Sequence, residues 1–189
     1  SSGACSEVSM QAFKSKKGER GFNSEGMGPM GFGISTAIGS CIASCGKRTI
    51  CIDGDGGFAM NTQELETIRR LNLPIIFFVL DNNGYASIRA TQKSYFENRY
   101  FASSNEGGLT LPKLKNIANA YDIHFIEMES NNDINIMVQK SLQLGKPVIC
   151  RVKVSEKQVT APRVTSRLTK EGNMETAPME QMWPEVFCE

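Results

Sequence analysis

The sequence predicts a doubly wound α/β fold, in which helices cover both faces of a mainly parallel sheet. Two observations predict it. Strand-like segments alternate with segments of helical periodicity along most of the 189 residues. In addition, residues 74–80 (PIIFFVL) are continuously apolar, as is typical of a strand buried on both faces of a parallel sheet. We expect one domain at residues 1–154, followed at residues 155–189 by an extended tail that packs on this domain or on a neighbour.

The first half of the chain predicts a strand–helix–strand unit. Residues 30–45 are mostly small, with glycines at intervals, which predicts a helix that approaches a neighbouring element closely. Residues 48–53 predict a short strand. Residues 61–72 begin with capping residues and carry acids early and arginines late, so they predict a helix. A right-handed crossover to the strand at residues 74–80 would make the two strands parallel neighbours.

The second half continues the alternation. Helices are predicted at residues 112–121 and 133–144, and strands at residues 124–128 and 148–154. Beyond residue 154 the periodicity stops, and prolines break up a segment that still contains several methionines and the only tryptophan. This tail is too apolar for a solvated, disordered segment.

Composition excludes several classes of protein. The formal net charge of +1 gives no reason to expect nucleic acid or a membrane as a partner. No apolar run approaches the roughly 20 residues that span a bilayer, and no secretory signal pattern opens the chain. Because the chain does not begin with Met, we expect it to be part of a longer polypeptide.

The cysteines predict thiols rather than disulfides or a zinc site. The sequence contains no C-x-x-C motif and a single histidine, His124, for which we expect a packing role. Buried free thiols favour a reducing compartment, the cytoplasm. The six cysteines are Cys5, Cys41, Cys45, Cys51, Cys150 and Cys188.

Two glycine-rich turns follow the two strands of the first half, GDGG at residues 54–57 and DNNGY at residues 81–85. The carboxyl ends of parallel neighbours lie at one edge of the sheet, where α/β folds bind ligands. Asp55, the side-chain oxygen of Asn82 and the carbonyl of Gly84 would suit Mg²⁺, with a diphosphate supplying further oxygens. Each motif alone is also compatible with ordinary turn chemistry.

The same motifs resemble the signature of thiamine-diphosphate-dependent enzymes, in which GDG is followed at this distance by an Asn pair that binds Mg²⁺ and the diphosphate. The segments GMGPMGFGISTAIG (residues 26–39) and GNMETAPMEQMWP (residues 172–184) resemble, more narrowly, the cofactor-binding C-terminal domain of the acetolactate synthase group. The resemblance covers nearly the whole chain. It implies the thiamine-diphosphate-binding fold and metal ligands at Asp55, Asn82 and Gly84.

The resemblance also implies roles for residues around the cofactor. The carbonyl of Gly28 would accept from the pyrimidine amine, and Met30 would be the wedge that keeps the cofactor bent, although it could instead be an ordinary core methionine. Gly56 and Gly57 would donate backbone N–H groups to the diphosphate. The residues expected to contact the cofactor are Ser6, Gly54, Asp55, Gly56, Gly57, Asn82, Gly84, Tyr85, Ala86 and Ile88.

Departures from the family pattern bear on the reaction. Asp81 replaces the first Asn of the pair, and Gly57 replaces the usual Ser. The stretch YASIRAT at residues 85–91 lacks the Glu of pyruvate-type decarboxylases, and Thr91 stands near the Trp typical of acetolactate synthases. We therefore expect a carboligase that decarboxylates a 2-oxo acid such as pyruvate and transfers the resulting unit to a carbonyl acceptor. The alternatives are a decarboxylase or lyase, a keto-sugar carboligase, or a non-catalytic nucleotide-binding or assembly module.

The resemblance implies that half of the active site lies outside this chain. The family's essential Glu belongs to a pyrimidine-binding domain, often of a second subunit, so we expect a homodimer or tetramer. FAD, if it is bound, would occupy an absent middle domain. The chain alone should bind the cofactor weakly and be inactive.

Overall fold

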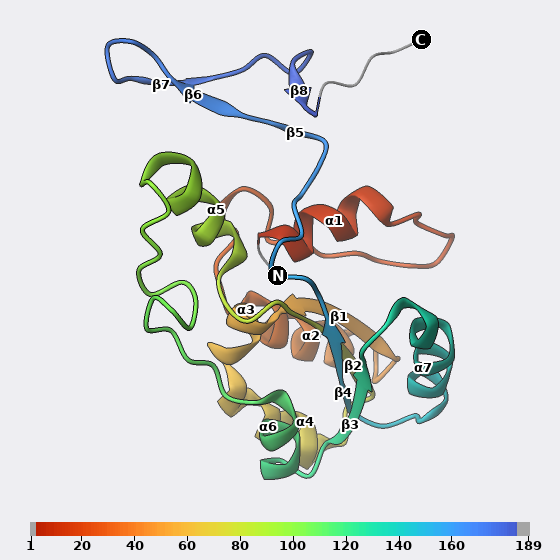
Figure 1. Ribbon diagram of the computed structural model, residues 1–189. Coiled ribbons are helices and arrows are strands. Elements are labelled where there is room, and N and C mark those ends of the chain that lie inside the picture. The colour runs from red at the N-terminus through yellow and green to blue at the C-terminus, as the bar shows by residue number, and fades with distance from the viewer. Residues whose placement is uncertain (1–2, 185–189) are drawn as a thin grey trace. The chain divides into compact units, whose positions relative to one another are not determined.

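A four-stranded parallel sheet organises the first part of the computed structural model, which describes residues 3–184 (Figure 1). Its strands are β1 (Thr49–Gly54), β2 (Ile75–Asp81), β3 (His124–Met128) and β4 (Val148–Lys153), in the order β1-β2-β4-β3. β1 pairs with β2 in parallel, as the crossover between them predicted. The chain divides into two compact units at Glu156 and Lys157, two residues beyond the predicted boundary.

The central strand β2 is buried on both faces, as its apolar run predicted. Phe77 and Val79 belong to one core, whereas Ile76 belongs to another on the opposite face, with Phe78 packed against it. Successive side chains of a strand point to opposite faces, so β2 can be this apolar only because helices cover both sides.

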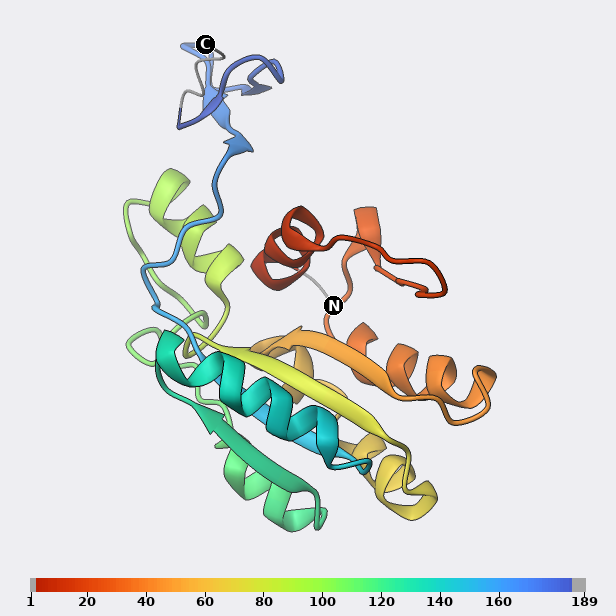
Figure 2. The same cartoon turned by 90° about the vertical axis from the view of Figure 1, so that its right-hand side faces the viewer.

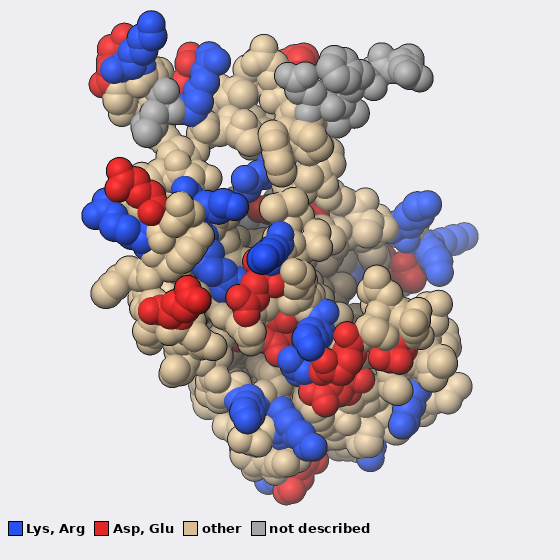
Figure 3. All heavy atoms as spheres, in the orientation of Figure 1, with Lys and Arg blue, Asp and Glu red and all other residues tan. Residues whose placement is uncertain are grey.

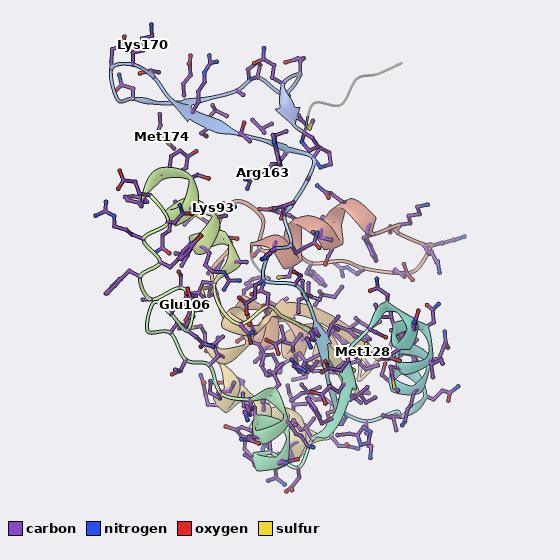
Figure 4. The ribbon with its side chains drawn as sticks, in the orientation of Figure 1. Lys93, Glu106, Met128, Arg163, Lys170 and Met174 are labelled. Atoms are coloured by element: carbon purple, nitrogen blue, oxygen red, sulfur yellow. The ribbon has the colours of Figure 1, made fainter. Side chains whose placement is uncertain are left out.

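Helices from different parts of the chain cover the two faces of the sheet (Figure 2). The larger core is closed by α2 (Phe32–Ala43), α4 (Leu65–Leu71) and α6 (Leu114–Ala120), through Ile34, Leu65 and Ile117 among others. The smaller core lies under α7 (Asn131–Gln143), and Met128 at the end of β3 is buried in it (Figure 4). The predicted doubly wound α/β fold is therefore confirmed.

The glycine-rich helix α2 makes the predicted close approach at one point. A Cβ on Gly33 would overlap Oδ2 of Asp53 and lie 3.2 Å from Sγ of Cys51, so no larger residue fits against β1 here. At Gly39, in the same helix, a Cβ would meet nothing within 4 Å. Asp53 is 1% exposed and its Oδ1 accepts from the N–H of Gly54 over 2.8 Å, which agrees with a structural role at the strand end.

Several boundaries differ from the prediction. The helix expected at residues 61–72 begins as a 3-10 turn, η2 (Thr62–Glu64), before α4. The helix α5 (Ala86–Tyr95) was not predicted, because its weakly apolar sequence is exposed over much of its surface. The remaining helical elements are α1 (Ala4–Ala12), η1 (Glu25–Met27) and α3 (Asp55–Ala59).

The second unit, described from residue 157 to 184, contains two short antiparallel strand pairs that the sequence did not predict. β5 (Arg163–Val164) pairs with β8 (Met182–Trp183), and β6 (Ser166–Leu168) pairs with β7 (Met174–Thr176). The guanidinium of Arg163 lies 5.9 Å from the centre of the Trp183 ring. That this tail packs on the domain or on a neighbour stays a prediction.

No disulfide joins the five described cysteines, as predicted. Four of them are buried, but Cys45 is exposed because it lies just beyond the end of α2 in a left-handed conformation, with φ 58°. Cys188 lies outside the described residues.

Acidic and basic side chains are mixed on the visible face of residues 3–156 (Figure 3), in keeping with the net charge of +1. Within residues 3–184, none of the helices has the length and apolar character needed to cross a membrane.

Candidate functional site

The two glycine-rich turns meet at the carboxyl edge of the sheet, as predicted. Gly54 pairs with Leu80 in the β1–β2 register, so the strands end side by side. The chain then turns into α3 at Asp55, and the backbone N–H of Gly84 donates to Oδ2 of this residue over 2.9 Å. Asp55 and Gly84 are therefore neighbours in space although 29 positions separate them.

A buried aromatic pair fixes α3 above the sheet. Phe58 lies one helical turn after Asp55, and its ring packs edge to face against Phe77 of β2, with centroids 5.5 Å apart. Both phenylalanines are fully buried. Such pairs contribute about 0.5–1.5 kcal/mol beyond the area they bury, so this contact helps to hold Asp55 in place.

The carboxylate of Asp55 is buried and accepts hydrogen bonds from two backbone N–H groups. It is 6% exposed, and Oδ1 accepts the N–H of Gly56 over 2.7 Å while Oδ2 accepts that of Gly84. The pKa of Asp55 is raised to about 6, mainly by burial; the N–H groups of Gly84 and Gly56 lower it, and the neighbouring charge of Asp81 adds to the rise. A cation at this carboxylate would offset the cost of burying its charge, so the site fits a metal ion.

The metal would depend on mixed oxygen ligands. Within residues 3–184 there is no cluster of three or more His, Cys, Asp or Glu side chains that could hold an ion. One carboxylate, one amide oxygen and one carbonyl form an incomplete set that leaves room for ligand oxygens, as Mg²⁺ sites for phosphates do.

An arginine of α5 holds the loop that carries the other two predicted ligands. Nη2 of Arg89 donates to the main-chain carbonyl of Asn82 over 3.0 Å and to its side-chain Oδ1 over 3.3 Å. Nη1 donates to the carbonyls of Asn83 and Ser103, each over 3.2 Å. Arg89 was not among the predicted site residues, because most of its acceptors are backbone carbonyls, which no sequence motif marks.

A second charged group lies beside the site. Arg151 of β4 pairs with Asp81 at 2.5 Å, with Glu127 of neighbouring β3 and with Glu129 just after β3. Lys153 also pairs with Glu129, at 3.1 Å. From the sequence, Asp81 was noted only as a replacement for Asn; in the structure its carboxylate forms an ion pair with an arginine of β4, the neighbouring strand of the sheet.

Met30 and Tyr85 meet over Gly56. A Cβ on Gly56 would lie 2.5 Å from the ring of Tyr85 and 3.3 Å from Cε of Met30. Three predicted site residues from separate segments are thus brought together. Met30 is 37% exposed, so it is not an ordinary core methionine. The side chain of Asn61 donates to the carbonyl of Gly31 over 2.8 Å and ties the Met30 segment to the end of α3.

Other predicted residues lie around this centre. Gly28 ends η1 in the left-handed region, with φ 48°. Ser6 of α1 donates to Oδ1 of Asn23 over 2.8 Å, and α1 approaches α5 where a Cβ on Gly3 would lie 2.7 Å from Oγ of Ser87. In α5, Ile88 is 42% exposed.

The backbone donors differ from the expectation in one respect. The N–H of Gly56 is directed at Oδ1 of its own neighbour Asp55, because α3 begins at Asp55. A diphosphate role for Gly56 would therefore require this bond to be given up, and the N–H of Gly57 is the simpler candidate of the two.

Comparisons with known proteins point to one family. The family described as "Thiamine pyrophosphate enzyme, C-terminal TPP binding domain" matches residues 1–152, thiamine pyrophosphate being another name for thiamine diphosphate. "Probable acetolactate synthase large subunit" of Methanococcus aeolicus is 35% identical over 72% of this chain and 22% of its own length. "Acetolactate synthase isozyme 2 large subunit" of Escherichia coli K12 is 33% identical over 77% of this chain and 26% of its own length.

A plant acetolactate synthase is similar to this chain over a comparable range. "Acetolactate synthase 1, chloroplastic" of Zea mays is 29% identical over 82% of this chain and 25% of its own length. The chain thus spans about a quarter of the length of the curated relatives that it matches.

Proposed function

Because the chain belongs to the C-terminal TPP-binding domain family of thiamine pyrophosphate enzymes, we propose that it is the cofactor domain of a carboligase. The enzyme would decarboxylate a 2-oxo acid such as pyruvate and transfer the resulting unit to a carbonyl acceptor, as the names of its acetolactate synthase relatives suggest. The whole enzyme would be cytoplasmic.

The observation that carries this proposal is the hydrogen bond between Gly84 and Asp55. It joins the two turns whose oxygens would bind Mg²⁺ and places a buried carboxylate with a raised pKa at the carboxyl edge of the sheet. Ligands of doubly wound folds bind at this edge.

Thiamine diphosphate, when bound, would supply the electron sink that stabilises the negative charge left by decarboxylation. The residues of this chain would hold it. Asp55, the side chain of Asn82 and the carbonyl of Gly84 would carry the Mg²⁺, and the N–H of Gly57 would donate to the diphosphate. Met30 and Tyr85, which meet over Gly56, would limit the positions that the rings can take.

Transfer to an acceptor is favoured over simple decarboxylation by the residues that follow the metal loop. Residues 85–91 contain no Asp or Glu, so this segment offers no acid to protonate a carbanion and release an aldehyde. Thr91, just past the middle of α5, is a smaller residue near the place of the Trp typical of acetolactate synthases, which suits an acceptor larger than pyruvate, such as a keto-sugar.

We further propose the partners that this chain would need. A pyrimidine-binding domain, from the same polypeptide or a second subunit, would supply the essential Glu, which makes a dimer or tetramer the functional unit. FAD would belong to a middle domain. The isolated chain would bind the cofactor weakly and be inactive.

Two measurements on the full-length protein test the proposal. Titration calorimetry with thiamine diphosphate should show binding that requires Mg²⁺; no binding under either condition would leave a non-catalytic module instead. Product analysis with pyruvate, alone and with added aldehydes and keto-sugars, should then show a carbon–carbon bond in the product. Acetaldehyde as the sole product would contradict a carboligase and support the decarboxylase alternative.

A further inference from the structure

The strongest unassigned feature beside the site is the guanidinium of Arg89. Its hydrogen bonds reach three residues that are not adjacent to it, and all of its acceptors are oxygens. Two of these, the side-chain and main-chain oxygens of Asn82, belong to a residue proposed to bind the metal. A guanidinium has five donors in a fixed plane, so it can set several oxygens relative to one another.

Arg89 is itself held by the helix and by the loop that it contacts. Its backbone N–H donates to the carbonyl of Tyr85 over 2.9 Å, one turn earlier in α5. The carbonyl of Ser103 accepts from the N–H of Tyr85 over 3.0 Å as well as from Nη1 of Arg89. The start of α5, the metal loop and the segment around Ser103 are therefore joined at one point.

Ser103 supplies a buried anchor for this arrangement. It is 0% exposed, and its hydroxyl donates to Oε1 of Gln92, whose Nε2 donates in turn to the carbonyl of Phe101 over 2.9 Å. Figure 4 shows α5, marked by Lys93, beside the loop that carries Glu106. Side chains one turn apart on α5 thus hold the same loop against the helix.

Gly84 lies between the carboxylate of Asp55 and the guanidinium of Arg89. Its N–H points to Asp55, and a Cβ in its place would lie 2.6 Å from the carbonyl oxygen of Ser103 and 2.9 Å from Nη1 of Arg89. Its φ of 135° is also one that other residues rarely adopt. The loop therefore has a carboxylate on one side and a guanidinium on the other, which fixes the direction of its oxygens.

We propose that Arg89 is a positioning residue for the metal site, which orients the side-chain oxygen of Asn82 and the carbonyls of the loop before the metal binds. The inference rests on the proposed function, since it requires a Mg²⁺–diphosphate site. A carboxamide oxygen has two acceptor positions, so Oδ1 of Asn82 can accept from Arg89 and still bind a cation. Groups that hydrogen-bond to metal ligands commonly set metal affinity in this way, with effects of 10- to 100-fold.

Arg89 could also weaken metal binding, so the sign of the change in Mg²⁺ affinity distinguishes the two roles. Arg89 carries a positive charge, and a cation near a metal site opposes metal binding. If the guanidinium only competed with Mg²⁺ for Asn82, its removal would strengthen metal binding. If Arg89 instead positions the ligands, removal of its guanidinium should weaken Mg²⁺ binding.

The experiment compares full-length wild-type protein with Arg89→Met and Arg89→Lys, and with Arg99→Met as a control that removes an exposed arginine nearby. Calorimetry gives the Kd of Mg²⁺ at saturating thiamine diphosphate, and hydrogen exchange reports the order of residues 82–85. We expect Arg89→Met to raise the Kd at least tenfold and to speed exchange in the loop. Arg89→Lys should recover part of both, while Arg99→Met should leave both unchanged.

The outcomes separate this inference from the proposed function. Wild-type protein that binds no Mg²⁺ with thiamine diphosphate would overturn both. Wild-type binding together with an unchanged or lower Kd in Arg89→Met would overturn only the role of Arg89. If Arg89→Met does not fold, a Kd in Arg89→Lys equal to that of the wild type, with unchanged exchange, would also overturn it, since an ammonium cannot reproduce the planar set of donors.

Discussion

The backbone N–H of Gly84 donates to Oδ2 of Asp55 over 2.9 Å and so connects the turn after β1 with the turn after β2. This contact places a buried carboxylate beside a loop of carbonyl and amide oxygens. The carboxylate has a raised pKa, and its charge is unfavourable until a cation binds. The contact therefore has consequences for metal binding that can be measured.

Asp55→Ala should abolish Mg²⁺-dependent binding of thiamine diphosphate, with a loss of affinity of about 100-fold or more, because it removes the only carboxylate of the proposed ligand set. Calorimetry on the full-length protein measures this. Cys51→Ser, two strand positions before Asp53 and buried, is the control: it should lower the free energy of unfolding by about 1–3 kcal/mol but leave cofactor affinity unchanged. Equal affinity in Asp55→Ala and wild type would refute the metal assignment.

Two alanine substitutions in α2 should have opposite effects on the free energy of unfolding. Gly33→Ala places a Cβ against buried Asp53 and Cys51, and we expect it to destabilise the protein by about 1–3 kcal/mol. Gly39→Ala meets open space in α2 and should stabilise it by about 0.5–1 kcal/mol. Chemical denaturation compares the two, and similar values for both would mean that α2 does not approach β1 at Gly33.

Gly56→Ala tests the contact among Met30, Gly56 and Tyr85. The new methyl group would push against the Tyr85 ring, which must rotate away from the site. We expect the protein to fold but its affinity for thiamine diphosphate to fall roughly tenfold, about 1.4 kcal/mol, as the ring moves. Gly39→Ala is again the control, because it makes the same change of residue away from the site. Unchanged affinity in Gly56→Ala would show that Tyr85 does not border the cofactor.

Most of the parallel sheet could be predicted because its strands are marked by apolar runs, and the strand at residues 124–128 was predicted with its observed bounds. The helix α5 could not be predicted, because its packing depends on Arg89 and Gln92, which bind a loop rather than an apolar core. The strands of residues 157–184 are only two or three residues long, which is too short for an alternating pattern to mark them as strands.

The site was predictable to the extent that it depends on the strand ends. Parallel pairing of β1 with β2 was enough to bring Asp55 and Gly84 together. The partner of Asp81 was not predictable, because Arg151 reaches it from β4, and the order β1-β2-β4-β3 cannot be read from a sequence pattern. Which side chain neutralises a carboxylate depends on that order.

Arg151→Met should lower the free energy of unfolding by about 2 kcal/mol, because it removes charged hydrogen bonds to a half-buried Asp81. The matched control is Arg69→Met in α4, whose pair with Glu66 is exposed on both sides and should contribute nothing measurable. Thermal or chemical denaturation of both variants gives the comparison. An equal effect of the two substitutions would mean that the Asp81–Arg151 pair is as weak as a surface pair.

Proton competition at Asp55 should make Mg²⁺ binding depend on pH. Because burial raises the pKa of Asp55 to about 6, the carboxylate is charged and available at pH 7.5 but mostly protonated at pH 5. The apparent affinity for Mg²⁺ should therefore be constant above pH 7 and fall about tenfold per pH unit below 6. Titration of Mg²⁺ into thiamine diphosphate alone corrects for the cofactor's own protons. Asp81→Asn removes a charge that raises this pKa, so it should move the fall to lower pH; a profile unchanged in Asp81→Asn would contradict the coupling between the two carboxylates.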